Sequence, residues 1–226
     1  MAAPHSSFLH SLFSSFLIFL FSSFLIFLFS SCLHPSFAKK IPCISRQRAD
    51  SLAARLVLWN GRTCPLNTPA TDFTLRVTGQ RRPYGYTPEQ VVASWTLYPE
   101  TWNRAPLLHI SNKELRRHLH IEGQYASVAQ LYDDKGYRLQ ALWEQQPDKH
   151  TQLCMAIRET DQRVQLIADL VGGTLIRPAP DDAPRPAQWR IRAEILLNSA
   201  PFFDILYAAA LLLTTLLFVR HIHKKK

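Results

Sequence analysis

The chain has 226 residues, of which 47% are hydrophobic, and carries a formal net charge of +9 at neutral pH. Because the arginines of the middle segment alternate with acids, and the last cations follow an apolar run, this charge favours a membrane surface over a nucleic acid. Two apolar runs near the ends leave a middle segment of about 160 residues, which is enough for one modest core.

Four cysteines, Cys32, Cys43, Cys64 and Cys154, occur without any CxxC pair. The common zinc and redox spacings are therefore missing, and we expect no metal site. A bridge between Cys43 and Cys64 is one alternative in an oxidising compartment. If Cys32 is removed by processing, an odd number remains, which argues against a complete disulfide framework.

The N-terminal run repeats FSSFLIFL without change at residues 13–20 and 21–28. It is long enough to span a bilayer, but no Lys or Arg precedes it, which is atypical of a signal peptide. Residues 1–38 are therefore expected to be an uncleaved membrane anchor or a signal sequence cleaved after Ala38. Lipidation at Cys32 is a third alternative. All three place the following segment on the same side of the membrane.

Turn and capping signals organise the next part of the chain. Ser45 is expected to cap a helix with apolar residues at helical spacing, namely Ala49, Leu52, Ala53, Leu56 and Val57. The turn dipeptide Asn60-Gly61 and two prolines then predict a loop from Asn60 to Pro69, without regular helix over residues 65–69. A short helical or strand segment through residues 73–77 is expected to end at Gly79.

A second helix is predicted from Pro88 to about Leu97. Thr87 is its N-cap, Pro88 occupies the first helical position and Gln90 the third. Its apolar side consists of Val91, Val92 and Trp95. Residues 107–110 are expected to form a short strand.

Further helices are predicted after residue 110. The capping pattern of Ser111 and Glu114 opens one helix, stopped near Gly123, and residues 126–132 form another. A longer helical stretch over residues 137–170 is interrupted at Pro147. The apolar side of its second half is expected to contain Leu153, Ile157, Val164, Ile167, Ala168 and Val171, before Gly172-Gly173 ends it.

The C-terminal part is expected to lead into the membrane. Four prolines in residues 177–186 predict an extended linker, residues 188–197 approach the bilayer amphipathically, and residues 202–219 are mainly apolar. The basic tail places the last end in the cytoplasm by the positive-inside rule. The predicted organisation is a signal or anchor (1–38), an extracytoplasmic helical domain (39–176), a Pro-rich linker and juxtamembrane segment (177–200), a transmembrane helix (201–220) and a basic cytoplasmic tail (221–226). The fold class is mainly α, with long loops and room for one small β pair.

Signatures of catalysis are scarce. The chain has no glycine-rich phosphate loop, GxSxG, HExxH or paired-carboxylate motif, so we predict no enzyme and no catalytic residue. His118 and His120, with His109 upstream, are the candidate haem ligands. On a helix two residues at this spacing point to nearly opposite sides, so surface histidines are the alternative interpretation.

Aromatic and charged residues also allow two interpretations each. Trp95, Trp102 and Trp143 could stack on a planar ligand such as haem, or serve as core aromatics or membrane-interface anchors. Arg62 could bind an anionic group such as a haem propionate, or tie its loop to a nearby carboxylate or carbonyl. Asp204 could pair with a partner helix or face water.

Several motifs, in one order, resemble a known family. The first is NGRTCPLNT, whose motif residues are Asn60, Gly61, Arg62, Pro65, Asn67 and Thr68. Further matching text comprises residues 87–91, the interval from Trp95 to Trp102, residues 113–116, 121–127 and 136–139, and Ala193-Glu194-Ile195 with Asn198. Together, over about residues 41–219, they resemble the fused system II cytochrome c biogenesis proteins of Bacteroidetes, which join ResB/CcsB-like and CcsA-like parts.

The resemblance implies a role in haem attachment. Such proteins export haem and attach it to the CXXCH motifs of apocytochromes c outside the cytoplasmic membrane. Their synthase half carries a WWD segment flanked by haem-ligating histidines, and this sequence has no such segment, so none of those residues can be carried over. The resemblance therefore implies a non-catalytic, membrane-anchored accessory component that assists haem delivery to apocytochrome c or supports a separate CcsA-like synthase.

The same resemblance implies partners and a location. The expected partners are a CcsA-like synthase or haem channel, apocytochrome c and the membrane, and not nucleic acid. The main domain would lie on the periplasmic side of the inner membrane. No cofactor is assigned, although haem is a candidate. The alternatives are a periplasmic haem-binding chaperone and a generic envelope interaction protein.

Overall fold

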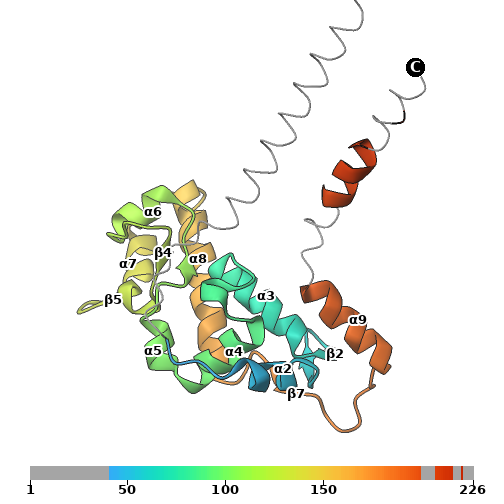
Figure 1. The fold of residues 1–226 in the computed structure, drawn as a ribbon. Helices are drawn as coiled ribbons and strands as arrows, with labels where there is room; N and C mark the ends of the chain where they lie inside the picture. Colours follow the sequence, from blue (N-terminus) through green and yellow to red (C-terminus); the bar gives the residue numbers. More distant parts are fainter. Residues whose placement is uncertain (1–40, 200–206, 216–219, 221–226) are drawn as a thin grey trace, which may run out of the picture. The chain divides into compact units, whose positions relative to one another are not determined.

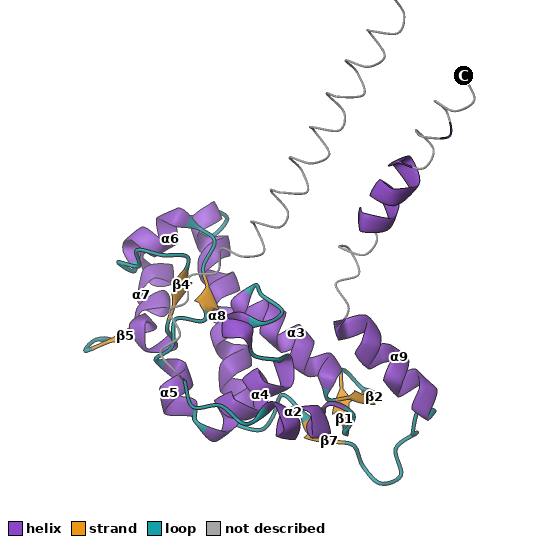
Figure 2. Cartoon of the chain, viewed as in Figure 1, coloured by secondary structure: helices purple, strands orange, loops and turns teal. Residues whose placement is uncertain are grey.

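A computed structural model describes residues 41–199, 207–215 and 220. This part is mainly helical with three small antiparallel sheets (Figures 1 and 2), which confirms the mainly α fold class but gives more β structure than the one pair predicted. The N-terminal segment 1–38 and the tail 221–226 lie outside the described residues. Of the expected span 201–220, residues 207–215 and 220 are described, and they are helical. Across the described ranges, no helix is both long and apolar enough to cross a membrane.

Eight α-helices of the described part are labelled in Figure 1. They are α2 (Arg46–Ala53), α3 (Asn67–Thr78), α4 (Pro88–Leu97), α5 (Pro99–Asn103), α6 (Lys113–His118), α7 (Arg138–Gln145), α8 (Gln152–Val171) and α9 (Gln188–Ser199). Two 3-10 turns are η1 (Pro83–Gly85) and η2 (Val128–Leu131). The strands are β1 (Leu56–Trp59), β2 (Arg62–Pro65), β3 (Leu108–His109), β4 (Tyr125–Ala126), β5 (Tyr132–Asp133), β6 (Gly136–Tyr137) and β7 (Arg177–Pro178). They pair in the orders β2-β1-β7, β3-β4 and β5-β6.

The dipeptide Asn60-Gly61 closes a two-residue β-hairpin. Both residues lie in the left-handed region, with φ of 48° and 76°, as a tight hairpin turn requires, and Trp59 pairs with Arg62 directly across it. The predicted loop from Asn60 to Pro69 is therefore wrong, because β2 follows the turn and α3 begins at Asn67. Pro69 is compatible with this helix, since the first turn has backbone N–H groups without an intrahelical acceptor.

The helix predicted after Ser45 is shorter than expected. Ser45 caps α2 by accepting a hydrogen bond from the Arg48 N–H, but the helix ends at Ala53. Leu56 and Val57 belong to β1, which is the central strand of its sheet and pairs on both sides. Its second partner, β7, lies in the stretch that was predicted to be an extended linker. Backbone pairing with two neighbours thus overrides the helical spacing of the apolar residues.

The predicted capping of α4 is confirmed. Thr87 Oγ1 accepts a hydrogen bond from the Gln90 N–H, and the Gln90 side chain accepts one from the Thr87 N–H. This arrangement fixes the start of α4 and orients Val91, Val92 and Trp95 into the core, where all three are buried. The helix packs against both α2 and α3.

Two tryptophans form the centre of the core. The rings of Trp95 and Trp102 lie 5.5 Å apart between centroids, and Phe73 meets Trp95 edge to face at 5.7 Å. Both indole N–H groups are satisfied, because Trp95 donates to Asn103 Oδ1 at 2.8 Å and Trp102 to the Pro42 carbonyl at 2.9 Å. These two tryptophans are core aromatics, and both side chains are almost fully buried.

The second half of the domain differs from prediction in its caps and small strands. Asn112, not Ser111, caps α6, because its side chain accepts from the Leu115 N–H. The helix predicted over residues 126–132 is instead β4 followed by η2. The expected break at Pro147 is confirmed, since it separates α7 from α8.

Four of the six residues predicted for the apolar side of α8 are buried. These are Leu153, Ile157, Val164 and Ile167. Ala168 and Val171 are exposed, so the prediction was wrong for the last turn. The helix ends at the predicted glycines, where Gly173 takes a φ of 72°.

Candidate functional site

The hairpin, α3 and α9 meet at a polar junction, which we call the α9 junction, formed by Arg62, Thr68, Arg81, Glu194 and Asn198. Glu194 Oε1 accepts hydrogen bonds from Arg62 Nη2 at 2.8 Å and from Thr68 Oγ1 at 2.7 Å. Asn198 Nδ2 donates to Thr68 Oγ1 at 3.1 Å, and Arg81 Nη1 donates to the Asn198 carbonyl. The junction therefore fastens the last described full helix of the domain to elements more than a hundred residues earlier in the chain.

Local structure explains why these side chains converge. The tight turn of the hairpin places Arg62 at the start of β2, and Thr68 lies in the first turn of α3. On α9, Ile191, Glu194 and Asn198 follow one another at steps of three and four, which puts them on one side of the helix. Ile191 is buried, and the same side of α9 contacts α3 and β2.

The charge of Glu194 is stabilised within the junction. Burial alone would raise the pKa of this carboxyl, but hydrogen bonds from Arg62 and Thr68, with the positive charge of Arg62, leave its pKa lowered. The pKa of Arg62 is raised, chiefly by the hydrogen bond to Glu194. The side chain of Glu194 is 27% exposed and that of Arg62 55% exposed, so the pair is half open to solvent. Both groups are ionised at neutral pH, and a carboxylate of the same chain already engages the Arg62 guanidinium.

A second polar tie joins α3 to α4. Asn67 Nδ2 donates to Glu89 Oε1, and both residues are buried. Glu89 lies in the first turn of α4, where the helix dipole favours a negative charge. Gln90, the next residue, donates from Nε2 to the Ile44 carbonyl at 2.9 Å. The stretches around residues 60–68 and 87–91 are thus connected to each other and to the segment before α2.

The cysteines of the domain are free thiols. Cys43, Cys64 and Cys154 form no disulfide, so the candidate bridge between the first two is absent from the structure. Burial raises the pKa of both the Cys43 and the Cys64 thiol. A raised pKa lowers the fraction of reactive thiolate, so neither thiol is activated as a nucleophile. We interpret both side chains as packing residues.

The three candidate haem histidines lie in different surroundings. His109 is in β3, where its ring is half-buried at 5.3 Å from that of Tyr125 and 3.4 Å from the position that a Cβ on Gly79 would take. Burial, and then the charge of Arg163, lowers its pKa, so the imidazole is neutral at pH 7. His118 ends α6, and His120 follows with a φ of 54°; both are exposed. Nowhere in the described ranges do three or more His, Cys, Asp or Glu side chains gather in a way that could hold a metal.

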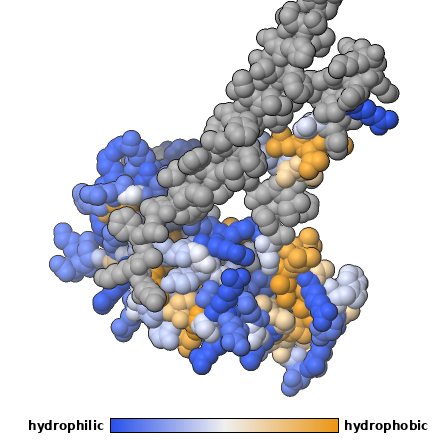
Figure 3. All heavy atoms as spheres, viewed as in Figure 1, coloured by the Kyte–Doolittle hydropathy of each residue, from blue (hydrophilic) through white to orange (hydrophobic). Residues whose placement is uncertain are grey.

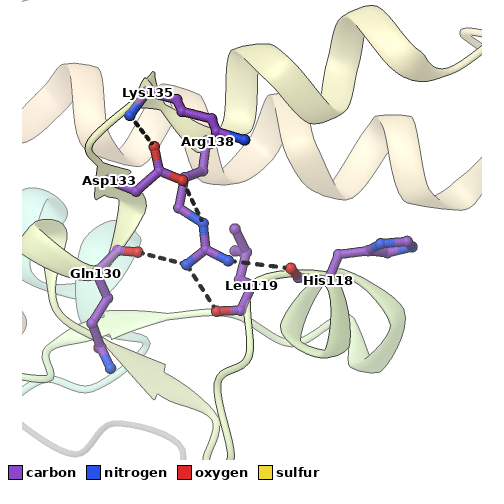
Figure 4. Close-up of polar contacts among 6 residues, drawn as sticks. All are labelled: His118, Leu119, Gln130, Asp133, Lys135 and Arg138. Carbon is purple, nitrogen blue, oxygen red and sulfur yellow. Dashed lines mark hydrogen bonds and ion pairs between the residues drawn. The ribbon is translucent and has the colours of Figure 1, made fainter.

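Arg138 organises the backbone beside His118 (Figure 4). Its guanidinium donates to the carbonyls of His118, Leu119 and Gln130, and it forms a 3.9 Å ion pair with Asp133. The first two carbonyls are at the C-terminal end of α6, where unpaired acceptors attract a cation. The imidazole of His118 points away from this cluster. The family resemblance included residues 136–139, but it gave no role for Arg138, because the partners of this side chain lie elsewhere in the sequence.

Two hollows lie on either side of Tyr137. The larger, of about 300 Å³, is between α7 and α8 and is lined by Tyr137, Leu139, Gln140, Trp143, Ile157, Arg158 and Asp161. None of the candidate histidines lines it. The smaller, of about 230 Å³, has His118 on its border with Tyr137 and Arg138. Pockets that enclose a drug-sized ligand measure about 300–1,000 Å³, so the larger hollow lies at the lower end of this range and the smaller hollow lies below it.

The tyrosine between the two hollows has a fixed orientation. Tyr137 Oη donates to Asp161 Oδ1 at 2.7 Å, and burial together with this carboxylate raises the pKa of the phenol. Trp143 faces the larger hollow and carries Lys149 over its ring at 4.9 Å. This hollow is therefore a small aromatic cleft with one cationic and one anionic side chain at its border.

Comparison of the chain with protein-family models gives no match, and comparison with the curated proteins gives none either. The fold and the α9 junction define a small, mainly helical domain with a fastened C-terminal helix.

Proposed function

We propose that this chain is a membrane-anchored, non-catalytic accessory component of system II cytochrome c biogenesis. Its helical domain stands on the extracytoplasmic side of the cytoplasmic membrane. There it supports a separate CcsA-like synthase, which delivers haem to apocytochrome c. The basis of this proposal is the resemblance of about residues 41–219 to the fused proteins, in their extracytoplasmic segment that precedes the synthase half.

The observation that carries the proposal is the contact between two distant stretches of the resemblance. Arg62 and Thr68 come from the first stretch, Glu194 and Asn198 from the last, and the four meet in the α9 junction. Because these contacts join the first stretch to the last, the two stretches belong to one structural unit. The contacts give a structural reason for the residue types found in both stretches. The unit holds the helix that precedes the apolar residues 202–219, as a support anchored in a membrane requires.

The proposal also accounts for the distribution of polar side chains. The motif residues Arg62, Asn67 and Thr68 are engaged in ties between elements, and none of them lines the hollows beside Tyr137. A catalytic site needs groups that converge on a substrate, whereas a support needs groups that fix its elements. The supporting role fits this arrangement better.

Affinity purification from the native host tests the proposal. The tagged chain is expected to retain a CcsA-like synthase, and deletion of its gene is expected to lower the level of haem-bearing cytochrome c. The Glu194→Ala variant should retain less synthase. The Arg158→Ala variant, in the larger hollow between α7 and α8, should retain as much as the unchanged chain. Absence of any synthase, together with an unchanged cytochrome c level in the deletion strain, would contradict the proposal.

A haem-binding chaperone is the second candidate, because His118 borders the smaller hollow beside Tyr137 and Arg138. Titration of the purified chain with haem distinguishes the two. A Soret shift that disappears in His118→Ala and persists in His120→Ala would favour the chaperone. A spectrum equal to that of free haem would leave the supporting role alone.

A further inference from the structure

The helix α9 has two different sides. One side carries Ile191, Glu194 and Asn198 and is fastened to the hairpin and α3. The other carries Trp189, Leu196 and Leu197, whose exposed fractions are 67%, 68% and 61%. Figure 3 shows hydrophobic and hydrophilic residues next to each other over this helix. We call the second side, with Arg190 and Arg192, the outer face of α9.

The outer face combines aliphatic, aromatic and cationic side chains. Arg190 and Arg192 are exposed, and in the part of the chain that the structure describes neither forms an ion pair. The Arg190 guanidinium lies 5.4 Å from the centre of the Trp189 ring. Trp189 is also the only exposed tryptophan among the five of the chain, all of which are described. Trp side chains are enriched at membrane–water interfaces, and Arg on the polar side of an interfacial helix adds attraction to anionic lipids.

The position of α9 in the chain favours a bilayer over another occupant. The helix ends at Ser199, and the 18 mainly apolar residues 202–219 begin three positions later. If these residues enter a membrane, the end of α9 lies no more than about 11 Å from the start of the span, because three positions of extended chain cover at most about 3.6 Å each. The α9 junction fixes which side of the helix is turned outward, so the outer face cannot rotate to hide its leucines against the domain.

We propose that the outer face of α9 lies in the headgroup region of an anionic phospholipid bilayer. Leu196, Leu197 and the Trp189 ring enter the boundary with the acyl chains, and Arg190 and Arg192 contact lipid phosphates. The inference rests on the membrane anchoring in the proposed function, and not on its role in cytochrome c assembly. Through the α9 junction, this contact sets the orientation of the whole described domain on the membrane.

Quenching of tryptophan fluorescence by brominated lipids tests the proposal. The full chain is reconstituted in phosphatidylcholine–phosphatidylglycerol vesicles with bromine on the acyl chains near the headgroup, without any synthase. The unchanged chain should be quenched, Trp189→Phe should lose most of that quenching, and Trp143→Phe should keep it. The quenching of Trp189 should be weaker in pure phosphatidylcholine vesicles. It should also be weaker in the Arg190→Gln/Arg192→Gln variant.

Flotation of the same vesicles separates the outcomes. If the chain floats and Trp189→Phe and Trp143→Phe are quenched alike, the outer face does not touch the bilayer and the inference is overturned while anchoring stands. If the chain does not float at all, both the inference and the anchoring are overturned. Because no cytochrome or synthase is present, loss of the partner assignment would leave this result unchanged.

Discussion

Substitutions in the α9 junction should destabilise the domain in an order set by exposure. Thr68→Val removes the hydroxyl that donates to Glu194 at 2.7 Å and accepts from Asn198 at 3.1 Å. A hydrogen bond to a charged group contributes about 1.5–3 kcal/mol, so this variant should lose about 2 kcal/mol of unfolding free energy. Arg62→Met removes an ion pair in which the arginine is 55% exposed, and solvent screening reduces its expected cost to about 0.2–1 kcal/mol.

Glu194→Ala should cost more than Arg62→Met, because the carboxylate accepts both bonds. We expect a loss of about 2–3 kcal/mol, and non-additivity with Thr68→Val, since the two residues contact each other directly. Arg190→Met is the matched control on the exposed side of the same helix, and its effect should stay within about 0.5 kcal/mol.

Urea unfolding of the purified full chain in mild detergent provides the measurement. The fluorescence of the buried Trp95 and Trp102 reports the loss of the core. Equal costs for Arg62→Met and Thr68→Val would refute the reasoning from exposure. A Glu194→Ala variant as stable as the Arg190→Met control would show that the junction does not fasten α9.

Four further changes test separate parts of the structure. Trp102→Phe should lower the unfolding free energy by about 2 kcal/mol in the same urea assay, because it leaves a cavity and an unpaired backbone carbonyl. Arg138→Met should cost about 2 kcal/mol, since three carbonyls lose their donor. Gly61→Ala should cost about 1 kcal/mol because of its left-handed φ, and Gly123→Ala, with ordinary φ and no close contact, should be nearly neutral in parallel melts. The pKa of Glu194 is lowered in the folded state, so its contribution to stability is complete above the unfolded pKa of about 4.3. That contribution is lost as the pH falls through the folded pKa. The urea midpoint of Glu194→Gln should therefore depend less on pH over this range than that of the unchanged chain.

Local signals in the sequence were sufficient for the capped helices. Thr87, Pro88 and Gln90 predict α4 because all the interactions of its cap lie within four residues. The break at Pro147 is likewise local, since a proline beyond the first turn of a helix removes a backbone hydrogen bond and clashes with the preceding turn. These features depend on no distant partner, and the structure has them where they were predicted.

The β1–β2–β7 sheet could not be predicted in this way. Val57 has helical spacing to Ala53, but it pairs with Cys64 on one side and with Pro178 on the other. The second partner lies in a proline-rich stretch more than a hundred residues later, and nothing local connects the two. A strand that gains its stability from such pairing has no signature of its own in a short window.

The α9 junction shows the same limit for the candidate site. Arg62 and Glu194 are 132 positions apart, so the sequence could suggest only that Arg62 needs a carboxylate or an anionic group. The resemblance included Glu194 and Asn198, but it gave no indication that they meet Arg62 and Thr68. For the candidate histidines, closeness in sequence was misleading. His118 and His120 are two positions apart, but both are exposed and they do not form a common site within the described residues.

The residue types around the hairpin are explained by the turn that they form and by the elements that they tie together. Gly61 is needed for the left-handed turn, Arg62 and Thr68 hold Glu194, and Asn67 holds Glu89. Each tie joins elements that are distant in sequence, and two of them hold α9 with a defined side turned outward. That helix precedes the apolar residues 202–219 in the sequence. If those residues enter a membrane, as we propose, the orientation of the domain on it depends on the Glu194 carboxylate and the Thr68 hydroxyl. In the proposed function, these motif residues therefore serve to fix the orientation of the domain.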